Sequence, residues 1–212
     1  LDDEPRLCQE GFAQYLHLGY SLAPTTILEA VEQLPHGYLA TWKSASLVIR
    51  RYSDLAEIAN HGSQHKLSFK DCLDALDHSL SQSLKRHHNA DVPIGIVLSG
   101  GVDSSLLACK SSEVAPTPFP CFTMDFKQTE FSEAHEAARL ANLIGTEHTV
   151  FNLHEESFFA QWKALAWQTD APIFDNSFPA TSELYRQVQK HVKVALSGAA
   201  GDELFLGYEK YR

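Results

Sequence analysis

The hydrophobic positions of this chain change their period along its length, and the first zone, residues 1–54, mixes two patterns. Apolar residues at helical spacing predict two short helices, at 10–18 and 26–33. Alternating apolar and polar residues then predict a hairpin made of strands 38–42 and 46–50. The zone therefore carries local structure but no long periodic segment of its own.

The next segment, residues 55–68, is polar and predicts a linker between two domains. It contains the run His61-Gly62-Ser63-Gln64-His65-Lys66, which has few residues that a core would bury. After it, Ser68 is expected to cap a helix over 69–88, where apolar residues recur at helical spacing. The boundary between the domains is therefore expected before Phe69.

The second zone, residues 69–212, alternates short apolar runs with amphipathic segments. The runs predict strands at 94–98, 120–126, 148–152 and 192–196, and the segments predict helices at 104–110, 132–144, 155–168 and 178–190. Such alternation predicts an α/β fold with a mostly parallel, doubly wound sheet that helices cover on both faces. Ligands of such sheets bind beyond the carboxyl ends of the strands, where the strand order reverses.

The strand at 94–98 runs directly into a glycine turn flanked by hydroxyls and a carboxylate. Gly100 and Gly101 allow the backbone to approach a phosphate closely, and the following helix offers the positive end of its dipole. Ser99 and Ser104 add hydroxyl donors, as does Ser105. Asp103 would repel a bare phosphate, which suggests a magnesium ion between carboxylate and phosphate. The alternative is an ordinary turn between a strand and a helix.

A second segment, residues 192–205, repeats this arrangement. An apolar strand leads into Ser197-Gly198, small residues follow, and Asp202 and Glu203 come next. Asp103 and Asp202 would then both supply carboxylates to one magnesium ion, with the phosphates of ATP and water as its other ligands. The alternative is that the acids simply favour the first turn of the next helix.

Composition limits the classes of function that remain. A chain of 212 residues with 44% hydrophobic residues can bury a large core, and no apolar run is long enough to span a bilayer. The net charge of −10 argues against a nucleic-acid partner. Four cysteines without a Cys-x-x-Cys pair fit a reducing cytoplasm. The first residue is Leu1 rather than methionine, and no signal peptide follows, which predicts a fragment or a processed product.

The first loop resembles the Ser-Gly-Gly-x-Asp-Ser loop of the PP-loop ATP pyrophosphatases, which have an adenine nucleotide alpha hydrolase-like fold. With the second loop and further segments in the same order, it resembles the synthetase domain of glutamine-hydrolysing asparagine synthases. These segments are Phe126, Phe131-Ser132-Glu133, 143–148, Asp170-Ala171-Pro172 and Gly207-Tyr208. Residues 1–54 resemble the end of the glutaminase domain of the same family, through segments 15–20, Thr26-Ile27 and 34–38.

This resemblance implies an ATP-dependent ligase in asparagine biosynthesis or a related pathway. A substrate carboxylate would attack ATP, releasing pyrophosphate and leaving an acyl-adenylate that ammonia or another amine converts to an amide. Pyrophosphate and magnesium would be held by Ser99, Gly100, Gly101, Asp103 and Ser104. The adenosine would be bordered by Val97, Met124, Ser197 and Gly198. Asp202 would complete the metal site with Asp103, and the two acids are the expected catalytic residues.

The chain also departs from the family pattern. Ala199 stands where relatives carry an acid that the family is thought to use in amine attack, and Ala200 stands where they carry glycine. Alanine at 200 would strain the turn if that position requires a positive φ. Met124-Asp125 lacks a small residue, often glycine, at its second position, and Val97 and Met124 would serve equally as core residues. The alternative function is therefore a catalytically impaired nucleotide-binding or scaffold homologue. The acceptor, the role of a glutaminase segment and a homodimer are left open.

Overall fold

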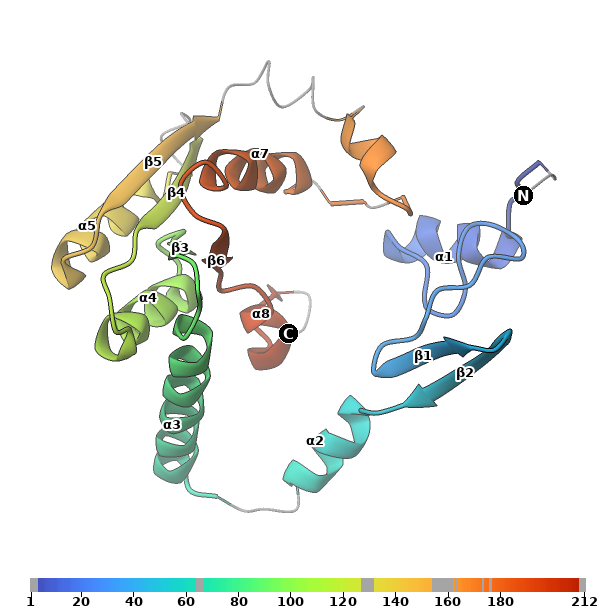
Figure 1. The fold of residues 1–212 in the computed structure, drawn as a ribbon, viewed down its shortest axis with the longest axis horizontal. Coiled ribbons are helices and arrows are strands. Elements are labelled where there is room, and N and C mark those ends of the chain that lie inside the picture. Colours follow the sequence, from blue (N-terminus) through green and yellow to red (C-terminus); the bar gives the residue numbers. More distant parts are fainter. Residues whose placement is uncertain are drawn as a thin grey trace. The chain divides into compact units, whose positions relative to one another are not determined.

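A computed structural model describes residues 4–63, 67–126, 132–153, 162, 164–172, 174–175 and 177–209 (Figure 1). The chain forms two compact units. The first unit combines residues 1–68 with 163–176, and the second combines 69–162 with 177–212. A segment from the middle of the second zone therefore belongs to the first unit. In the described part of the chain, no helix is both long enough and apolar enough to cross a membrane.

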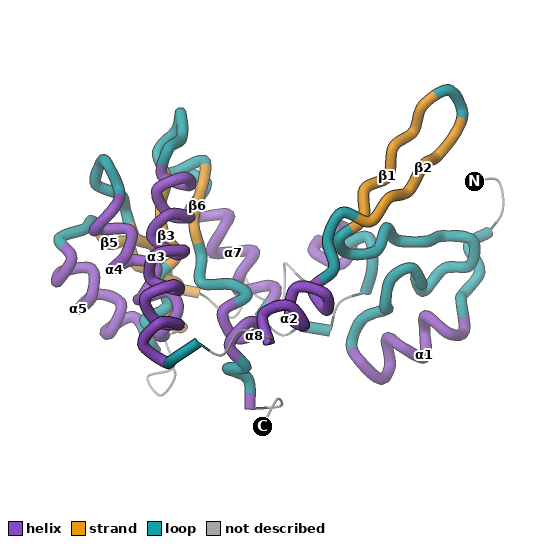
Figure 2. Tube along the Cα trace, turned by 90° about the horizontal axis from the view of Figure 1, so that it is seen from below, coloured by secondary structure: helices purple, strands orange, loops and turns teal. Residues whose placement is uncertain are grey.

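The first unit contains helix α1 (Gln9–Leu18), a hairpin of strands β1 (Tyr38–Lys43) and β2 (Ser46–Arg51), and helix α2 (Leu55–Ser63). Helix α1 ends at Gly19, whose φ of 86° is the left-handed conformation that closes many helices. The hairpin strands pair antiparallel from Tyr38↔Arg51 to Lys43↔Ser46. Figure 2 shows that the rest of the first unit is mainly loop. The first predicted helix and the hairpin are confirmed.

The helix predicted over 26–33 is wrong. The Thr26 hydroxyl accepts a hydrogen bond from the Leu28 N–H at 3.1 Å and donates one to the Val31 carbonyl at 2.8 Å. Leu28 also pairs with Leu7 in an isolated antiparallel bridge. A threonine that bonds nearby backbone groups in this way competes with helix formation. The apolar spacing was therefore outweighed by turn chemistry.

Residues 55–63, which were expected in the linker, form helix α2. The cause is Asp54, whose carboxylate accepts the N–H groups of Ala56 at 2.8 Å and of Glu57 at 3.4 Å. Arg51 adds ion pairs to Asp54 at 2.6 Å and to Glu57 at 2.7 Å. An aspartate that accepts the first N–H groups of a helix stabilises its start. The polar composition concealed this cap.

The second unit confirms the predicted α/β fold. Its elements are α3 (Phe69–His88), β3 (Ile94–Val97), α4 (Val102–Val114), β4 (Cys121–Phe126), α5 (Ala134–Ile144), β5 (His148–Leu153), α7 (Phe178–Val188), β6 (Val194–Leu196) and α8 (Gly201–Phe205). The four strands pair in parallel in the order β5-β4-β3-β6. The helix predicted over 155–168 is described only at residue 162 and over 164–168, which are helical.

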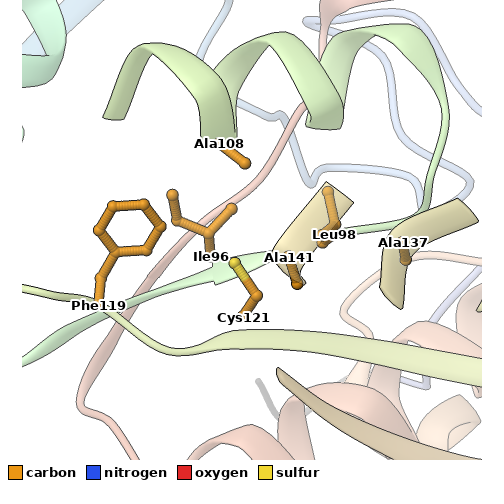
Figure 3. Close-up of a cluster of buried hydrophobic side chains, with 7 residues drawn as sticks. All are labelled: Ile96, Leu98, Ala108, Phe119, Cys121, Ala137 and Ala141. Atoms are coloured by element: carbon orange, nitrogen blue, oxygen red, sulfur yellow. The ribbon is translucent and has the colours of Figure 1, made fainter. Parts of the chain in front are cut away.

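Two hydrophobic clusters attach helices to opposite faces of this sheet. On one face Ile96, Leu98 and Cys121 pack against Ala108 of α4 and against Ala137 and Ala141 of α5 (Figure 3). On the other, Phe122 and Val192 pack with Leu184 and Val188 of α7. Figure 1 shows α4 and α5 on one side of the strands and α7 on the other. The three layers are those of a doubly wound sheet.

The strand order places the reversal point between β3 and β6. From β3 the chain passes to β4 and then β5 on one side, whereas β6 adds to the other side of β3. Neighbouring strands whose connections leave in opposite directions create a crevice at their carboxyl ends. The two loops singled out in the sequence follow these two strands, so the topology brings both to the same crevice.

One polar group on this sheet makes stability depend on pH. Thr123 is buried, and its hydroxyl proton goes to the Leu98 carbonyl, so its oxygen accepts from His148 Nε2 at 2.8 Å. This arrangement requires the proton of neutral His148 to lie on Nε2. Burial lowers the pKa of His148 below its ordinary value of 6.5.

We expect the free energy of unfolding to fall as the pH drops below about 6.5, because the unfolded chain then binds a proton that the folded His148 resists. His148→Gln should reduce this slope between pH 7 and pH 5, as measured by urea unfolding. His78→Gln, at an exposed position of α3, is the control and should keep the original slope. Equal slopes for all three proteins would contradict the assignment.

Candidate functional site

At position 100, the loop after β3 has a backbone conformation that favours glycine. Leu98 is buried, Ser99 is exposed, and Gly100 has a φ of 90°. A Cβ at Gly100 would lie 2.8 Å from the carbonyl oxygen of Glu133, just before α5. Both the left-handed φ and this close approach favour glycine at position 100. The loop thus rests on the start of α5.

The hydroxyls of Ser99 and Ser104 form hydrogen bonds within this loop. Ser104 Oγ accepts the Ser99 N–H at 3.1 Å and lies 2.9 Å from Ser99 Oγ. Ser99 Oγ accepts the Gly101 N–H at 3.2 Å. Ser104 Oγ also lies 3.3 Å from the Gly101 carbonyl, to which it can donate. These bonds fix the loop in the shape that leads into α4.

Helix α4 begins just after this loop, with Gly101 as its N-cap and Asp103 in its first turn. The first N–H groups of a helix lack partners within it, and the helix dipole makes this end positive. An anion bound at the loop would therefore meet backbone donors. The Asp103 carboxylate, partly buried beside them, would offer oxygen atoms to a cation that accompanied such an anion.

The loop after β6 packs directly on the first turn of α4. A Cβ at Gly198 would lie 2.9 Å from the backbone nitrogen of Ser104 and 3.1 Å from Asp103 Cβ. A Cβ at Gly201 would overlap the Asp103 carboxylate. The structure therefore brings the two predicted loops together around Asp103. Gly201 was missed in the sequence, where the repeated Ser-Gly pattern drew attention to its start rather than its end.

Ala200 lies in the left-handed region, with a φ of 73°. The turn has this conformation without the glycine that the resembled family carries there, so the condition for strain is met. A left-handed alanine costs about 1 kcal/mol or more. Ala199, its neighbour, has no carboxylate, so the loop presents backbone groups and small side chains.

Asp202 lies in the first turn of α8, together with Glu203. Its carboxylate approaches Gly207, where a Cβ would overlap it, while the Glu203 carboxylate accepts the hydroxyl of Tyr208 at 3.0 Å. Among the described residues, no three histidine, cysteine or acidic side chains gather as a metal site. The pairing of Asp202 with Asp103 at one ion therefore stays a prediction.

The remaining predicted contacts divide between the loops and the core. Ser197 and Gly198 lie in the second loop, beside α4. Val97 and Met124 instead pack against the cluster of Phe122 on the α7 face. The structure accounts for both as core side chains, and their role beside an adenosine stays a prediction.

Two cavities contain residues that the sequence did not single out as functional. One, of about 640 Å³, is lined by Gly100, Ser105 and the α5 residues Glu136, Arg139, Leu140, Asn142 and Leu143. The other, of about 700 Å³, lies in the first unit and is lined by Asp170-Ala171-Pro172 and by several residues between Tyr20 and His36. The sequence predicts these α5 residues only as part of a helix over 132–144, and the cavity that they share with Gly100 sets them apart.

Comparison with known proteins gives one family for most of the chain. The model of the asparagine synthase family matches residues 75–212. A putative glutamine-hydrolysing asparagine synthetase of Mycobacterium tuberculosis is 33% identical, over 93% of this chain and 30% of its own length. Asparagine synthetase 1 of Bacillus subtilis is 30% identical, over 96% of this chain and 32% of its own length. The chain thus spans about a third of the length of these relatives.

The solved structures that are similar to this one include an NH3-dependent NAD synthetase from Campylobacter jejuni. It is 17% identical with a TM-score of 0.44, and the match covers 64% of this chain and 60% of that one.

The strain at Ala200 can be measured by making the same substitution, alanine to glycine, at Ala200 and at Ala199. Ala200→Gly and Ala199→Gly add the same freedom to the unfolded chain, but only the first relieves a left-handed alanine. We expect Ala200→Gly to be more stable than Ala199→Gly by about 1 kcal/mol in urea unfolding. Equal stability of the two variants would show that the turn carries no strain.

Proposed function

Since the chain belongs to the asparagine synthase family, we propose that it forms the ATP-binding part of an amidotransferase that activates a carboxylate substrate. The observation that carries the proposal is the meeting of two glycine loops around Asp103 at the point where the strand order reverses. Such a crevice suits a nucleotide, because backbone donors, a helix start and a carboxylate converge there.

In the proposed reaction a substrate carboxylate oxygen attacks the α-phosphorus of ATP. A bond from oxygen to the α-phosphorus forms, the bond to the bridging oxygen of the β-phosphate breaks, and pyrophosphate leaves with the bond electrons. The loop at 99–104 would bind this leaving group through backbone N–H groups and the Ser99 hydroxyl. Donors that are already in place stabilise charge as it develops.

The acids of the two loops fit a magnesium ion that accompanies the nucleotide. Asp103 and Asp202 offer carboxylate oxygens, and magnesium takes one or two of these together with phosphate oxygens and water. When bound, the ion neutralises charge on the departing pyrophosphate. Val97, Met124, Ser197 and Gly198 would border the adenosine.

The second half of the proposed reaction forms the amide. Ammonia, released from glutamine elsewhere in the protein, or another amine would attack the acyl carbon and displace AMP. Residues 1–54 would be the end of the glutaminase domain that supplies this nitrogen. The acceptor is a small-molecule carboxylate, either aspartate or a relative, and the protein would act in the cytoplasm.

Asp103→Asn tests the proposal because it keeps the size of the side chain and removes its charge. We expect the variant to bind ATP at least about tenfold more weakly than the unchanged protein in the presence of magnesium, a loss of about 1.4 kcal/mol, by calorimetry. The magnesium dependence of ATP affinity should also shrink.

Asp91→Asn is the matched control, since Asp91 is an exposed acid in the loop before β3. It should bind ATP as the unchanged protein does. If the unchanged protein bound no ATP with magnesium, the proposed function would be wrong. If Asp103→Asn bound as tightly as the control, the role given to Asp103 would be wrong.

A further inference from the structure

We propose that the carboxylate of Asp125 accepts hydrogen bonds from the ribose hydroxyls of ATP and makes the site selective for ribonucleotides. The inference rests on the proposed function and adds to it a residue outside the two glycine loops. Asp125 stands where the family pattern has a small residue, often glycine, so the proposed contact belongs to this chain rather than to the family.

The unpaired state of the Asp125 carboxylate is the first observation. Its oxygen Oδ1 is enclosed by the protein and has no hydrogen-bond partner among the residues that the structure describes. Most enclosed polar atoms in folded proteins have a partner, and an unpaired carboxylate is especially costly to enclose. A carboxylate only accepts hydrogen bonds, so the partner that would satisfy it is a donor.

The Asp125 side chain is within reach of a ligand. The residue as a whole is only partly buried, although Oδ1 is enclosed. Rotation about the last side-chain bond of an aspartate is soft and exchanges its two oxygens. A donor that approaches the carboxyl end of β4 can therefore bind either oxygen without a change in the backbone.

The register of β4 places this carboxylate on the face of the sheet that α4 and α5 cover. Side chains alternate between the two faces along a strand. Met124 packs in the cluster on the α7 face, whereas Cys121 packs with α4 and α5. Since β4 pairs with β5 without a break along its whole length, Asp125 shares its face with Cys121 and Thr123.

Thr123 shows how near this face of β4 is to the first glycine loop. Its hydroxyl donates to the carbonyl of Leu98, the residue directly before Ser99. Asp125 lies two residues further along β4, about 6.6 Å nearer the carboxyl end of the strand. The last pair between β3 and β4 is Val97↔Phe122. The strand β4 therefore carries the carboxylate past the end of β3, to the level of the loop.

The two ends of the nucleotide, as proposed, define where its ribose would lie. Val97 and Met124 would border the adenosine, and both pack against the cluster on the α7 face. The pyrophosphate would lie at the loop that leads into α4, which covers the other face. The ribose joins the base to the phosphates, so it would cross the edge of the sheet between these faces. Asp125 follows Met124 directly and faces the α4 side, which puts its carboxylate at this crossing.

The chemistry of the nucleotide narrows the choice of donor. Phosphate oxygens accept hydrogen bonds and repel a carboxylate, whereas the ribose offers two neighbouring hydroxyls that can donate to both oxygens of one carboxylate. A metal is a poor alternative, because within the described part of the chain no three acidic, histidine or cysteine side chains gather. The 6-amino group of adenine is the other donor, and the experiment below distinguishes it from the ribose.

Calorimetry with ATP and with 2′,3′-dideoxy-ATP, each with magnesium, tests the contact. We expect the unchanged protein to bind ATP at least about tenfold more tightly, as for hydrogen bonds to a charged group. In Asp125→Ala the ratio of the two affinities should fall to about one, because the acceptor is gone. Asp125→Asn keeps one neutral acceptor and should give an intermediate ratio. Asp91→Ala, at an exposed acid before β3, is the control and should keep the full ratio.

Unfolding in urea separates this contact from a structural role of Asp125. Without nucleotide, Asp125→Ala should be at least as stable as the unchanged protein, because it removes an unpaired carboxylate. Saturating ATP should stabilise the unchanged protein more than the variant, whereas 2′,3′-dideoxy-ATP should stabilise both equally. If Asp125→Ala were less stable without nucleotide and kept the ratio of affinities, the role of Asp125 would be structural and the inference wrong.

Each other contrary result has its own meaning. If Asp125→Asn kept the full preference for ATP, the charged acceptor would not bind the ribose. If Asp125→Ala lost a preference for ATP over purine riboside triphosphate, which lacks the 6-amino group, and kept the preference over 2′,3′-dideoxy-ATP, the carboxylate would bind the base. If its magnesium dependence shrank as expected for Asp103→Asn, the carboxylate would bind the ion. These results would overturn the inference alone, whereas an unchanged protein that bound neither nucleotide would overturn the proposed function.

Discussion

The close approach of two backbones at the carboxyl ends of β3 and β6 is the constraint on which the site depends. Gly198 and Gly201 bring the second loop against the first turn of α4, where a side chain at either position would collide with Ser104 or Asp103. Because β3 and β6 are hydrogen-bonded neighbours, this approach is built into the sheet. A ligand at the crevice therefore meets both loops at once.

Small core residues make that approach possible. Ala108 on α4 and Ala137 and Ala141 on α5 are buried against Ile96, Leu98 and Cys121 (Figure 3). Alanine allows a helix to lie close to the sheet, so the start of α4 is held beside the end of β3. Gly100 in turn rests on the backbone that leads into α5. The geometry of the loop is thus a consequence of how the helices pack.

The sequence predicted the second unit well because its segments have one dominant period each. The strands and the helix over 69–88 were found from apolar spacing alone, and the two loops from glycine and hydroxyl residues at strand ends. Where side chains bond to nearby backbone, spacing was misleading, as at Thr26 and Asp54. The membership of 163–176 in the first unit depends on contacts distant in sequence, which no local pattern contains. The contact of Gly201 with Asp103 also joins residues that are distant in sequence.

In the proposed reaction, anion binding and amide formation would place different demands on the second loop. Its shape depends on backbone conformation, and Ala200 adopts the left-handed φ despite the cost. Its proton chemistry depends on a side chain, and Ala199 has none that accepts a proton. The nearby Glu203 is already engaged with Tyr208. In the proposed reaction the second loop would therefore contribute backbone groups to nucleotide binding, whereas assistance to an attacking amine would have to come from the substrate, from water or from another residue.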